Sequence, residues 1–156
     1  MRLVAGRRDA IKMTDEEMRS FLEAGRDLQV ASINADGTPH LVTMWYVPRD
    51  GELAFWTYAK SQKVVNLRRD PRLSVLVATG DKYEELKGVS IIGRAEIVDD
   101  PDAVLGYGEA VYERYWGPLN DTVLGGVKAM SSKRVVIVVK PEKILSWDHS
   151  KLGGAY

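Results

Sequence analysis

The chain has 156 residues, of which 45% are hydrophobic and 28% charged, and its formal net charge is zero. This length suits one domain with an ordinary core, and the composition excludes a disordered or membrane-embedded chain. A neutral chain has no global attraction for nucleic acid or an anionic bilayer, so any anion site has to be local. With no cysteine and only two histidines, we expect neither disulfides nor a metal centre.

The N-terminal sequence has no apolar run of signal-peptide length, and no stretch of the chain reaches membrane-spanning length. We therefore expect a cytoplasmic protein with no membrane span and no nucleic-acid partner. A single domain is expected over residues 1–156, with a flexible segment at residues 1–13.

The first half of the chain predicts a helix followed by a β-meander. Thr14 and Glu17 form a capping box that opens a helix ending near Gly25. Two Asp-Gly pairs, at 36–37 and 50–51, separate alternating or apolar runs and are typical of hairpin turns. Strands are expected over residues 28–33, 39–47 and 53–58.

The second half predicts further strands and one long helix. Gly93 marks a bulge or a close approach in a long strand, and Asp100 with Pro101 begins a helix. Strands are expected over 73–79, 88–98 and 134–139, with 143–147 extending the last one, and a short helix over 121–130. About six mainly antiparallel strands with few helices favour a small β-barrel rather than a doubly wound sheet.

The stretch from Phe55 to Pro71 predicts a strand that turns into a short helix. Ser61 is a good N-cap, so free backbone N–H groups and a partial positive charge lie at the helix start, between Lys60 and Lys63. This combination predicts a phosphate site. The alternative is a solvated helix face, because a run of basic residues most often has that role.

Two segments resemble the pyridoxamine 5′-phosphate oxidase-like flavin-binding split barrels. They are Asp36-Gly-Thr-Pro39 and Phe55-x-Thr57-x-x-x-Ser61-x-Lys63, the second followed by Asp70-Pro71. Trp147-Asp-His-Ser-Lys151 is similar to the Trp-containing C-terminal segment of that family, and the likeness spans about residues 14–152. The resemblance implies a mainly β, six-stranded antiparallel split barrel. It also implies a homodimer that binds a flavin or deazaflavin in clefts between protomers, with the phosphate on the strand-to-helix block.

The resemblance favours the branch of the family that uses the deazaflavin coenzyme F420 over the branch that uses FMN. In the FMN branch, the strand after the Asp-Gly-x-Pro turn supplies basic residues to the phosphate, whereas residues 41–47 contain none here. Gln62 stands where that branch tends to have arginine, and a lysine appears at Lys60. Losing these cations weakens a compact phosphate site, since charge-assisted contacts are the strong ones. The runs 83–89 and 93–96 also resemble the F420 branch.

The expected function is an F420H2-dependent reductase that transfers hydride to a small conjugated acceptor of quinone, enone or tetrapyrrole type. The alternatives are an FMN-dependent oxidoreductase of the same fold and a module that binds flavin, deazaflavin or haem without turning it over. We assign no catalytic side chain, because the cofactor carries the chemistry and the protein orients it.

The cofactor-binding residues implied by the resemblance form three groups. The ring is expected against Thr43, Met44 and Trp45; the phosphate and tail against Thr57, Lys60, Ser61, Lys63 and Asn66; and Trp147 and Lys151 reach the cleft from the second protomer. Ordinary barrel core is the alternative role for Met44 and Trp45, and an exposed helical position is the alternative for Asn66. A C-terminal strand that closes the dimer is the alternative for Trp147 and Lys151.

Overall fold

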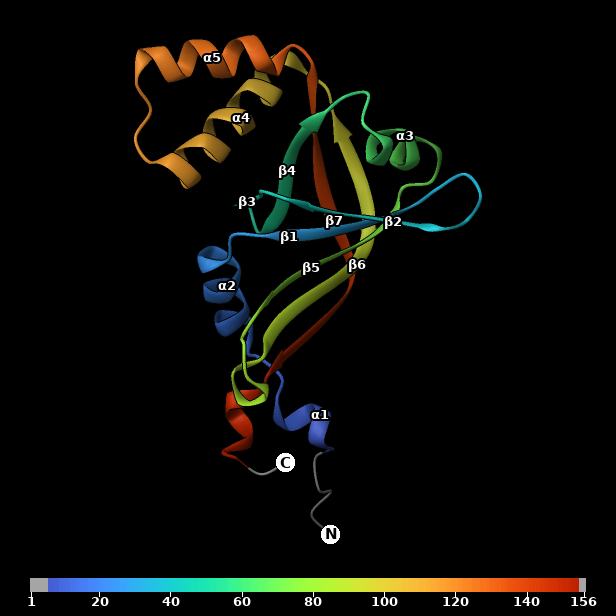
Figure 1. The fold of residues 1–156 in the computed structure, drawn as a ribbon, viewed down its shortest axis with the longest axis vertical. Helices are drawn as coiled ribbons and strands as arrows, with labels where there is room; N and C mark the ends of the chain where they lie inside the picture. The colour runs from blue at the N-terminus through green and yellow to red at the C-terminus, as the bar shows by residue number, and fades with distance from the viewer. Residues whose placement is uncertain (1–5, 155–156) are drawn as a thin grey trace.

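A single antiparallel sheet of seven strands organises the fold of the computed structural model, which describes residues 6–154. The strands are β1 (Leu28–Ile33), β2 (Pro39–Met44), β3 (Val47–Arg49), β4 (Glu52–Tyr58), β5 (Arg72–Thr79), β6 (Lys87–Val98) and β7 (Arg134–Asp148). Their order across the sheet is β2-β1-β5-β6-β7-β4-β3, and the sheet curls into a half-barrel (Figure 1).

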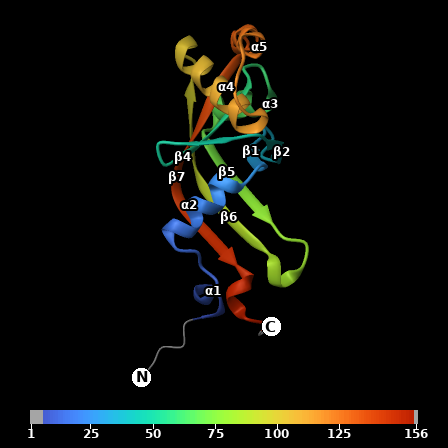
Figure 2. The ribbon, with the colours of Figure 1, turned by 90° about the vertical axis from the view of Figure 1, so that its left-hand side faces the viewer.

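Helices cover the sheet and its two ends. They are α1 (Arg7–Ala10), α2 (Asp15–Ala24), α3 (Gln62–Arg69), α4 (Pro101–Trp116) and α5 (Asp121–Ser131), with 3₁₀ turns η1 (Tyr83–Glu85) and η2 (His149–Leu152). Figures 1 and 2 show α4 and α5 at one end of the elongated molecule and α1 with η2 at the other. No helix within residues 6–154 has the length and apolar character that crossing a membrane requires.

The expectation of six strands is wrong, because the run 39–47 is divided into β2 and β3. Trp45 and Tyr46 leave the ladder between them, and the Tyr46 N–H donates instead to the Tyr115 hydroxyl oxygen at 3.1 Å. The two strands lie at opposite edges of the sheet. Since only two residues join these edges, the sheet has to curl until the edges nearly meet.

Two apolar cores explain why the sequences of β4 and β7 are continuously hydrophobic. Side chains on one face of both strands, such as Phe55 and Ile137, enter the barrel interior with Leu28, Val30 and Val64. Side chains on the other face, such as Trp56 and Val136, pack beneath α4 and α5. Strands buried on both faces lose the alternation of a half-exposed strand.

Local signals fix most helix ends and the bulge. The capping box is present: Glu17 N–H donates to Thr14 Oγ1 at 3.2 Å, and Thr14 N–H donates to Glu17 Oε2 at 2.8 Å. Asp100 caps α4 by accepting from Ala103 N–H at 3.0 Å. The register of β6 against β7 shifts between Ile92 and Gly93. A Cβ at Gly93 would lie 2.0 Å from the Lys140 carbonyl oxygen, which confirms the predicted bulge and close approach.

The N-terminal segment runs against the end of β7. Residues 1–5 of the expected flexible segment lie outside the described residues, whereas Met13 is buried in the barrel core. Asp148 N–H donates to the Ile11 carbonyl oxygen at 2.7 Å, and Met13 N–H donates to Ser146 Oγ at 3.1 Å. The described part of the segment is therefore tied to the barrel.

Candidate functional site

The start of α3 presents polar groups that no other part of residues 6–154 satisfies. Ser61 is the N-cap residue with an extended backbone, as predicted. Its side chain accepts no capping hydrogen bond, and its buried Oγ has no partner. The first N–H groups of the helix therefore point outward without a side-chain acceptor. A buried hydroxyl beside free N–H donors is the arrangement that a phosphate oxygen would complete.

Lys63 adds a cation beside this helix start. Its side chain is half-buried, burial lowers the pKa of its ammonium, and no carboxylate of residues 6–154 forms an ion pair with it. A partly desolvated ammonium without a counter-ion is unfavourable until an anion arrives. Lys60 lies two residues before the helix and is exposed. Together Ser61 Oγ, the α3 N–H groups and the two lysines form the candidate anion seat.

Asn66 has a structural role that the sequence did not indicate. Its residue is fully buried, with 0% exposure, rather than lying on an exposed helix face. Its Nδ2 donates to Ser32 Oγ at 3.1 Å and Asn34 Oδ1 at 2.9 Å, and its Oδ1 accepts from Gln62 Nε2 at 2.8 Å. These bonds fasten α3 to β1 and leave the amide group satisfied. Its predicted contact with the cofactor stays a prediction.

Thr57 is the remaining member of the strand-to-helix group. It lies near the end of β4 opposite Val135, on the face that enters the barrel interior, and it is 3% exposed. The anion seat thus lies in the segment that follows β4, and Thr57 lies in β4 itself, just before that segment.

A second feature is a cavity of about 350 Å3 at the place where β2 ends. It brings together Thr43, Met44 and Trp45, the three residues predicted to contact the cofactor ring, and no residue of α3 lines it. The lining is Asp27, Thr43, Met44, Trp45, Trp56, Val111, Tyr112 and Arg134. We call this cavity the Arg134 pocket.

The mouth of the Arg134 pocket is aromatic. Trp45, which is 42% exposed, stacks on Tyr115 with ring centroids 4.4 Å apart, and Trp116 meets Trp45 edge-on at 4.7 Å. Trp116 is itself 60% exposed and stacks on Tyr112 at 4.5 Å. This aromatic cluster therefore combines packed rings with two exposed ones, Trp45 and Trp116.

Trp56 and Arg134 are pocket residues that the sequence analysis missed. The Arg134 guanidinium carbon lies 4.6 Å from the centre of the Trp56 ring. Both positions follow from the pairing of β4 with β7, because Trp56 is opposite Val136 and Tyr58 is opposite Arg134. An arginine at the start of an apolar strand gives no signal of a pocket until that pairing is known.

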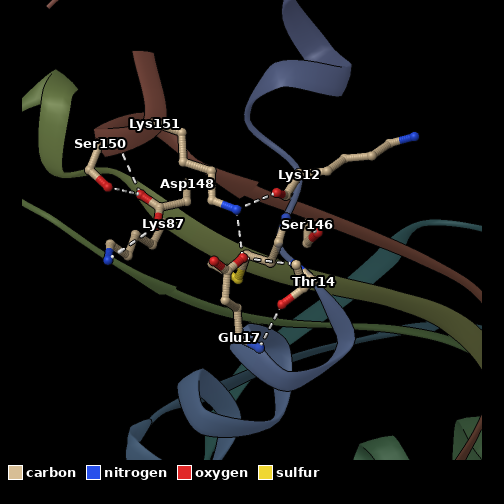
Figure 3. Close-up of polar contacts among 9 residues, drawn as sticks. Lys12, Thr14, Glu17, Lys87, Ser146, Asp148, Ser150 and Lys151 are labelled. Atoms are coloured by element: carbon tan, nitrogen blue, oxygen red, sulfur yellow. Dashed lines mark hydrogen bonds and ion pairs between the residues drawn. The ribbon is translucent and has the colours of Figure 1, made fainter. Parts of the chain in front are cut away.

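The third predicted group, Trp147 and Lys151, lies near the C-terminus of the chain. Lys151 Nζ donates to Glu17 Oε2 at 2.6 Å and to the Lys12 carbonyl oxygen at 2.8 Å (Figure 3). Trp147 covers Gly88 so closely that a Cβ there would lie 2.1 Å from the indole. Both residues contact their own chain, so their predicted contact with a cofactor would require the cleft of a second protomer.

The same end carries a compact polar network around Asp148. Burial raises the pKa of this carboxyl. Hydrogen bonds from Ser150 and the ammonium of Lys87 lower it by more than burial raises it, so the net shift is downward. Lys87 Nζ lies 3.3 Å from Asp148 Oδ2. No group of three or more potential metal ligands occurs among residues 6–154.

Comparisons with known proteins agree with this architecture. The family described as pyridoxamine 5′-phosphate oxidase matches residues 14–148. A solved structure of the conserved hypothetical protein Rv2991 from Mycobacterium tuberculosis is 46% identical, with a TM-score of 0.90, and the match covers 97% of this chain and 94% of that one. No curated protein sequence matches the chain.

Two further solved structures share the fold at lower sequence identity. A structure described as an F420 reductase is 29% identical, with a TM-score of 0.66 and coverage of 81% of this chain and 94% of that one. The heme storage protein HutZ from Vibrio cholerae is 16% identical, with a TM-score of 0.69 and coverage of 89% and 99%. The second likeness shows the shared fold alone.

Proposed function

The chain belongs to the pyridoxamine 5′-phosphate oxidase family, and on that premise we propose that it is an F420H2-dependent reductase acting on a small conjugated acceptor. The observation that carries the proposal is the anion seat, where a buried Ser61 Oγ and the half-buried Lys63 ammonium both lack a partner within residues 6–154. Similarity to a protein described as an F420 reductase supports the choice of cofactor.

The residues at the seat fit a phosphate that belongs to a long anionic chain. The α3 N–H groups and Ser61 Oγ donate hydrogen bonds to the phosphate oxygens, and Lys63 neutralises part of their charge. Lys60 is exposed two residues before the helix, where it would contact the anionic chain of the cofactor beyond the seat. Residues 41–47 add no further cation, so the seat lacks the dense charge that a compact FMN phosphate needs.

Thr43, Met44 and Trp45 are proposed to contact the cofactor ring at the mouth of the Arg134 pocket. Because no residue of α3 lines this pocket, we propose that the cofactor lies in a cleft between the protomers of a homodimer, where the seat and the ring contacts come from two chains. As the resemblance implies, Trp147 and Lys151 of the second protomer would reach the same cleft.

When bound, the reduced deazaflavin would supply the hydride for reduction of the acceptor, with the accompanying proton taken from solvent. The residues of the chain hold the reacting partners in contact and exclude water, and such positioning accounts for a large part of many rate enhancements.

Titration of the purified protein with F420 and with FMN tests the proposal. We expect F420 to bind more tightly and F420H2 to be oxidised when quinones or enones are added. Tighter binding of FMN would overturn the choice of cofactor in favour of an FMN-dependent oxidoreductase. Tight F420 binding with no hydride transfer across a broad panel of quinones, enones and tetrapyrroles would instead indicate a carrier module.

A further inference from the structure

Two side chains that line the Arg134 pocket have hydrogen-bond donors with no acceptor among residues 6–154. Arg134 is half-buried and uses one guanidinium N–H on the Met130 carbonyl oxygen at 3.2 Å. No carboxylate of residues 6–154 forms an ion pair with it. Arginine carries five N–H donors in a planar fork, so most of this donor capacity remains unused by the described protein.

Trp56 provides a second and independent donor. Its side chain is only 9% exposed, and its Nε1 is buried without a hydrogen-bond partner in the described chain. A buried indole N–H normally finds an acceptor, because leaving it unpaired costs free energy. Since Trp56 lines the same cavity that Arg134 lines, one acceptor group in the cavity can serve both residues.

The remaining walls of the pocket favour a flat molecule. Tyr112 and Val111 form part of the buried side, and Trp45 lies at the exposed mouth. A volume of about 350 Å3 is at the small end of the range that holds one ligand. Asp27 is the acidic lining residue, but it is exposed, so water screens its charge more strongly than that of the half-buried Arg134.

We infer that the Arg134 pocket binds the carboxylate of a planar conjugated acceptor, with Arg134 and Trp56 donating to the carboxylate and the aromatic mouth contacting the ring system. This inference rests on the proposed function, since it names the substrate class of that reductase. The cofactor ring then lies against the exposed Thr43–Trp45 side of the pocket, and the carboxylate end of the acceptor occupies the Arg134–Trp56 side.

Binding of a matched pair of probes tests the inference without requiring turnover. The pair is anthraquinone-2-carboxylate and anthraquinone-2-carboxamide, which share size and shape but differ in charge. We expect calorimetric titration of the wild-type protein to show about tenfold tighter binding of the carboxylate, because charge-assisted hydrogen bonds are roughly twice as strong as neutral ones. Equal affinities for the two probes would overturn the inference while leaving the F420 titration unaffected.

Variants assign that preference to the two donors. Arg134→Gln is expected to abolish the preference, Arg134→Lys to retain part of it, and Trp56→Phe to weaken carboxylate binding a few-fold while keeping the aromatic ring. Arg26→Gln is the matched control, because Arg26 also lies over an aromatic ring, 5.3 Å from the centre of Tyr115, but does not line the pocket. An undiminished preference for the carboxylate in both Arg134→Gln and Trp56→Phe would overturn the assignment. If Arg134→Gln does not fold, an undiminished preference in folded Trp56→Phe overturns it alone.

Titration of the probes in the presence of F420 separates this inference from the proposed function. With F420 at saturation, the carboxylate probe is expected to bind with unchanged or higher affinity, and its reduction by F420H2 is expected to have a lower KM than that of the carboxamide. Competitive displacement of the probe by F420 would show that the pocket belongs to the cofactor and would overturn the inference. Carboxylate preference in a protein that fails to bind F420 would overturn the proposed function and, with it, the acceptor role of the pocket.

Discussion

Lys151 lies 2.6 Å from Glu17 Oε2, the same oxygen that accepts the Thr14 N–H in the capping box of α2 (Figure 3). One carboxylate thus joins the C-terminal turn η2 to the first turn of α2, two elements more than 130 positions apart along the chain. Lys151 also donates to the Lys12 carbonyl oxygen, which fastens the segment before α2 to the same ammonium. We call these contacts the terminal clasp.

The terminal clasp predicts an acid-sensitive contribution to stability. The hydrogen bond from Lys151, and next the Thr14 N–H, hold the pKa of Glu17 below its usual value. A carboxyl whose pKa is lowered by folding stabilises the protein above its unfolded pKa, and this contribution is lost as pH falls through the folded pKa. We expect Lys151→Met to reduce the pH dependence of the free energy of unfolding in this acid range, measured by urea unfolding between about pH 6 and 3.

Lys143→Met is the control for the terminal clasp. Lys143 is an exposed lysine on β7 with no ion pair among the described residues, and we expect its loss to leave the acid dependence unchanged. An NMR titration of Glu17 provides a direct reading. A Glu17 pKa in Lys151→Met that stays as low as in the wild-type protein would contradict the assignment.

Lys63 predicts a separation of binding from stability. Burial lowers the pKa of its ammonium, so the charge is unfavourable in the free protein and favourable only when an anion is bound. Lys63→Met is expected to weaken F420 binding by about tenfold or more, since a hydrogen bond to a charged group contributes roughly 1.5–3 kcal/mol. The melting temperature of the free protein should not fall.

Arg68→Met is the matched control on the same helix. Arg68 is exposed in the last turn of α3, away from the seat at the helix start. Its removal is expected to change F420 affinity by less than about twofold, as exposed charges contribute little. Equal losses of affinity in Lys63→Met and Arg68→Met would indicate a diffuse electrostatic surface rather than a built seat.

The parts of the fold that follow local rules were predictable from the sequence. The capping box of α2, the Asp100 cap of α4 and the Asp-Gly turns depend on residues within four positions of one another. The bulge at Gly93 was predictable for the same reason, because glycine in a long apolar strand marks a close backbone approach. The position of Ser61 and Lys63 at one helix start belongs to this class, whereas their contact with an anion stays a prediction.

The parts that depend on distant residues could not be predicted. The division of β2 from β3 rests on the Tyr115 hydroxyl, which is 69 positions from Tyr46. Burial of Asn66 requires Ser32 and Asn34, whose side chains reach α3 only after β1 has joined the sheet. The place of Arg134 in a pocket likewise depends on strand pairing. Sequence patterning gives the elements, and long-range polar contacts decide which side chains remain free for a ligand.

Asn66 provides a direct test of that long-range network. Asn66→Ala would leave the Ser32 hydroxyl, the Asn34 side chain and Gln62 without their partner and would open a small cavity beneath α3. We expect a loss of about 2 kcal/mol in the free energy of unfolding, measured with urea, from unpaired polar groups and the cavity together. Gln62→Ala, which removes one exposed partner, should cost well under half as much. Comparable losses in the two variants would contradict a structural role for Asn66.

Tyr46 predicts an alkaline limit to stability. The residue is fully buried, its hydroxyl donates to the Leu22 carbonyl oxygen at 2.5 Å, and burial raises its pKa to about 12. When folding raises the pKa of an acid, its contribution to stability is complete at pH values below the unfolded pKa. This contribution is lost as pH rises through the folded pKa. Between about pH 10 and 12 we therefore expect the free energy of unfolding to fall by up to about 1.4 kcal/mol per pH unit.

Tyr46→Phe should remove that alkaline slope while lowering stability at neutral pH by about 1 kcal/mol, the usual net contribution of one hydrogen bond. Tyr58→Phe is the control, because Tyr58 is 46% exposed and takes no part in the buried hydrogen bond to Leu22. Urea unfolding of the three proteins from about pH 8 to 11.5 gives the comparison. If Tyr46→Phe keeps the wild-type slope above pH 10, the buried hydroxyl is not its origin, and the closure of the sheet around Tyr46 is looser than the structure indicates.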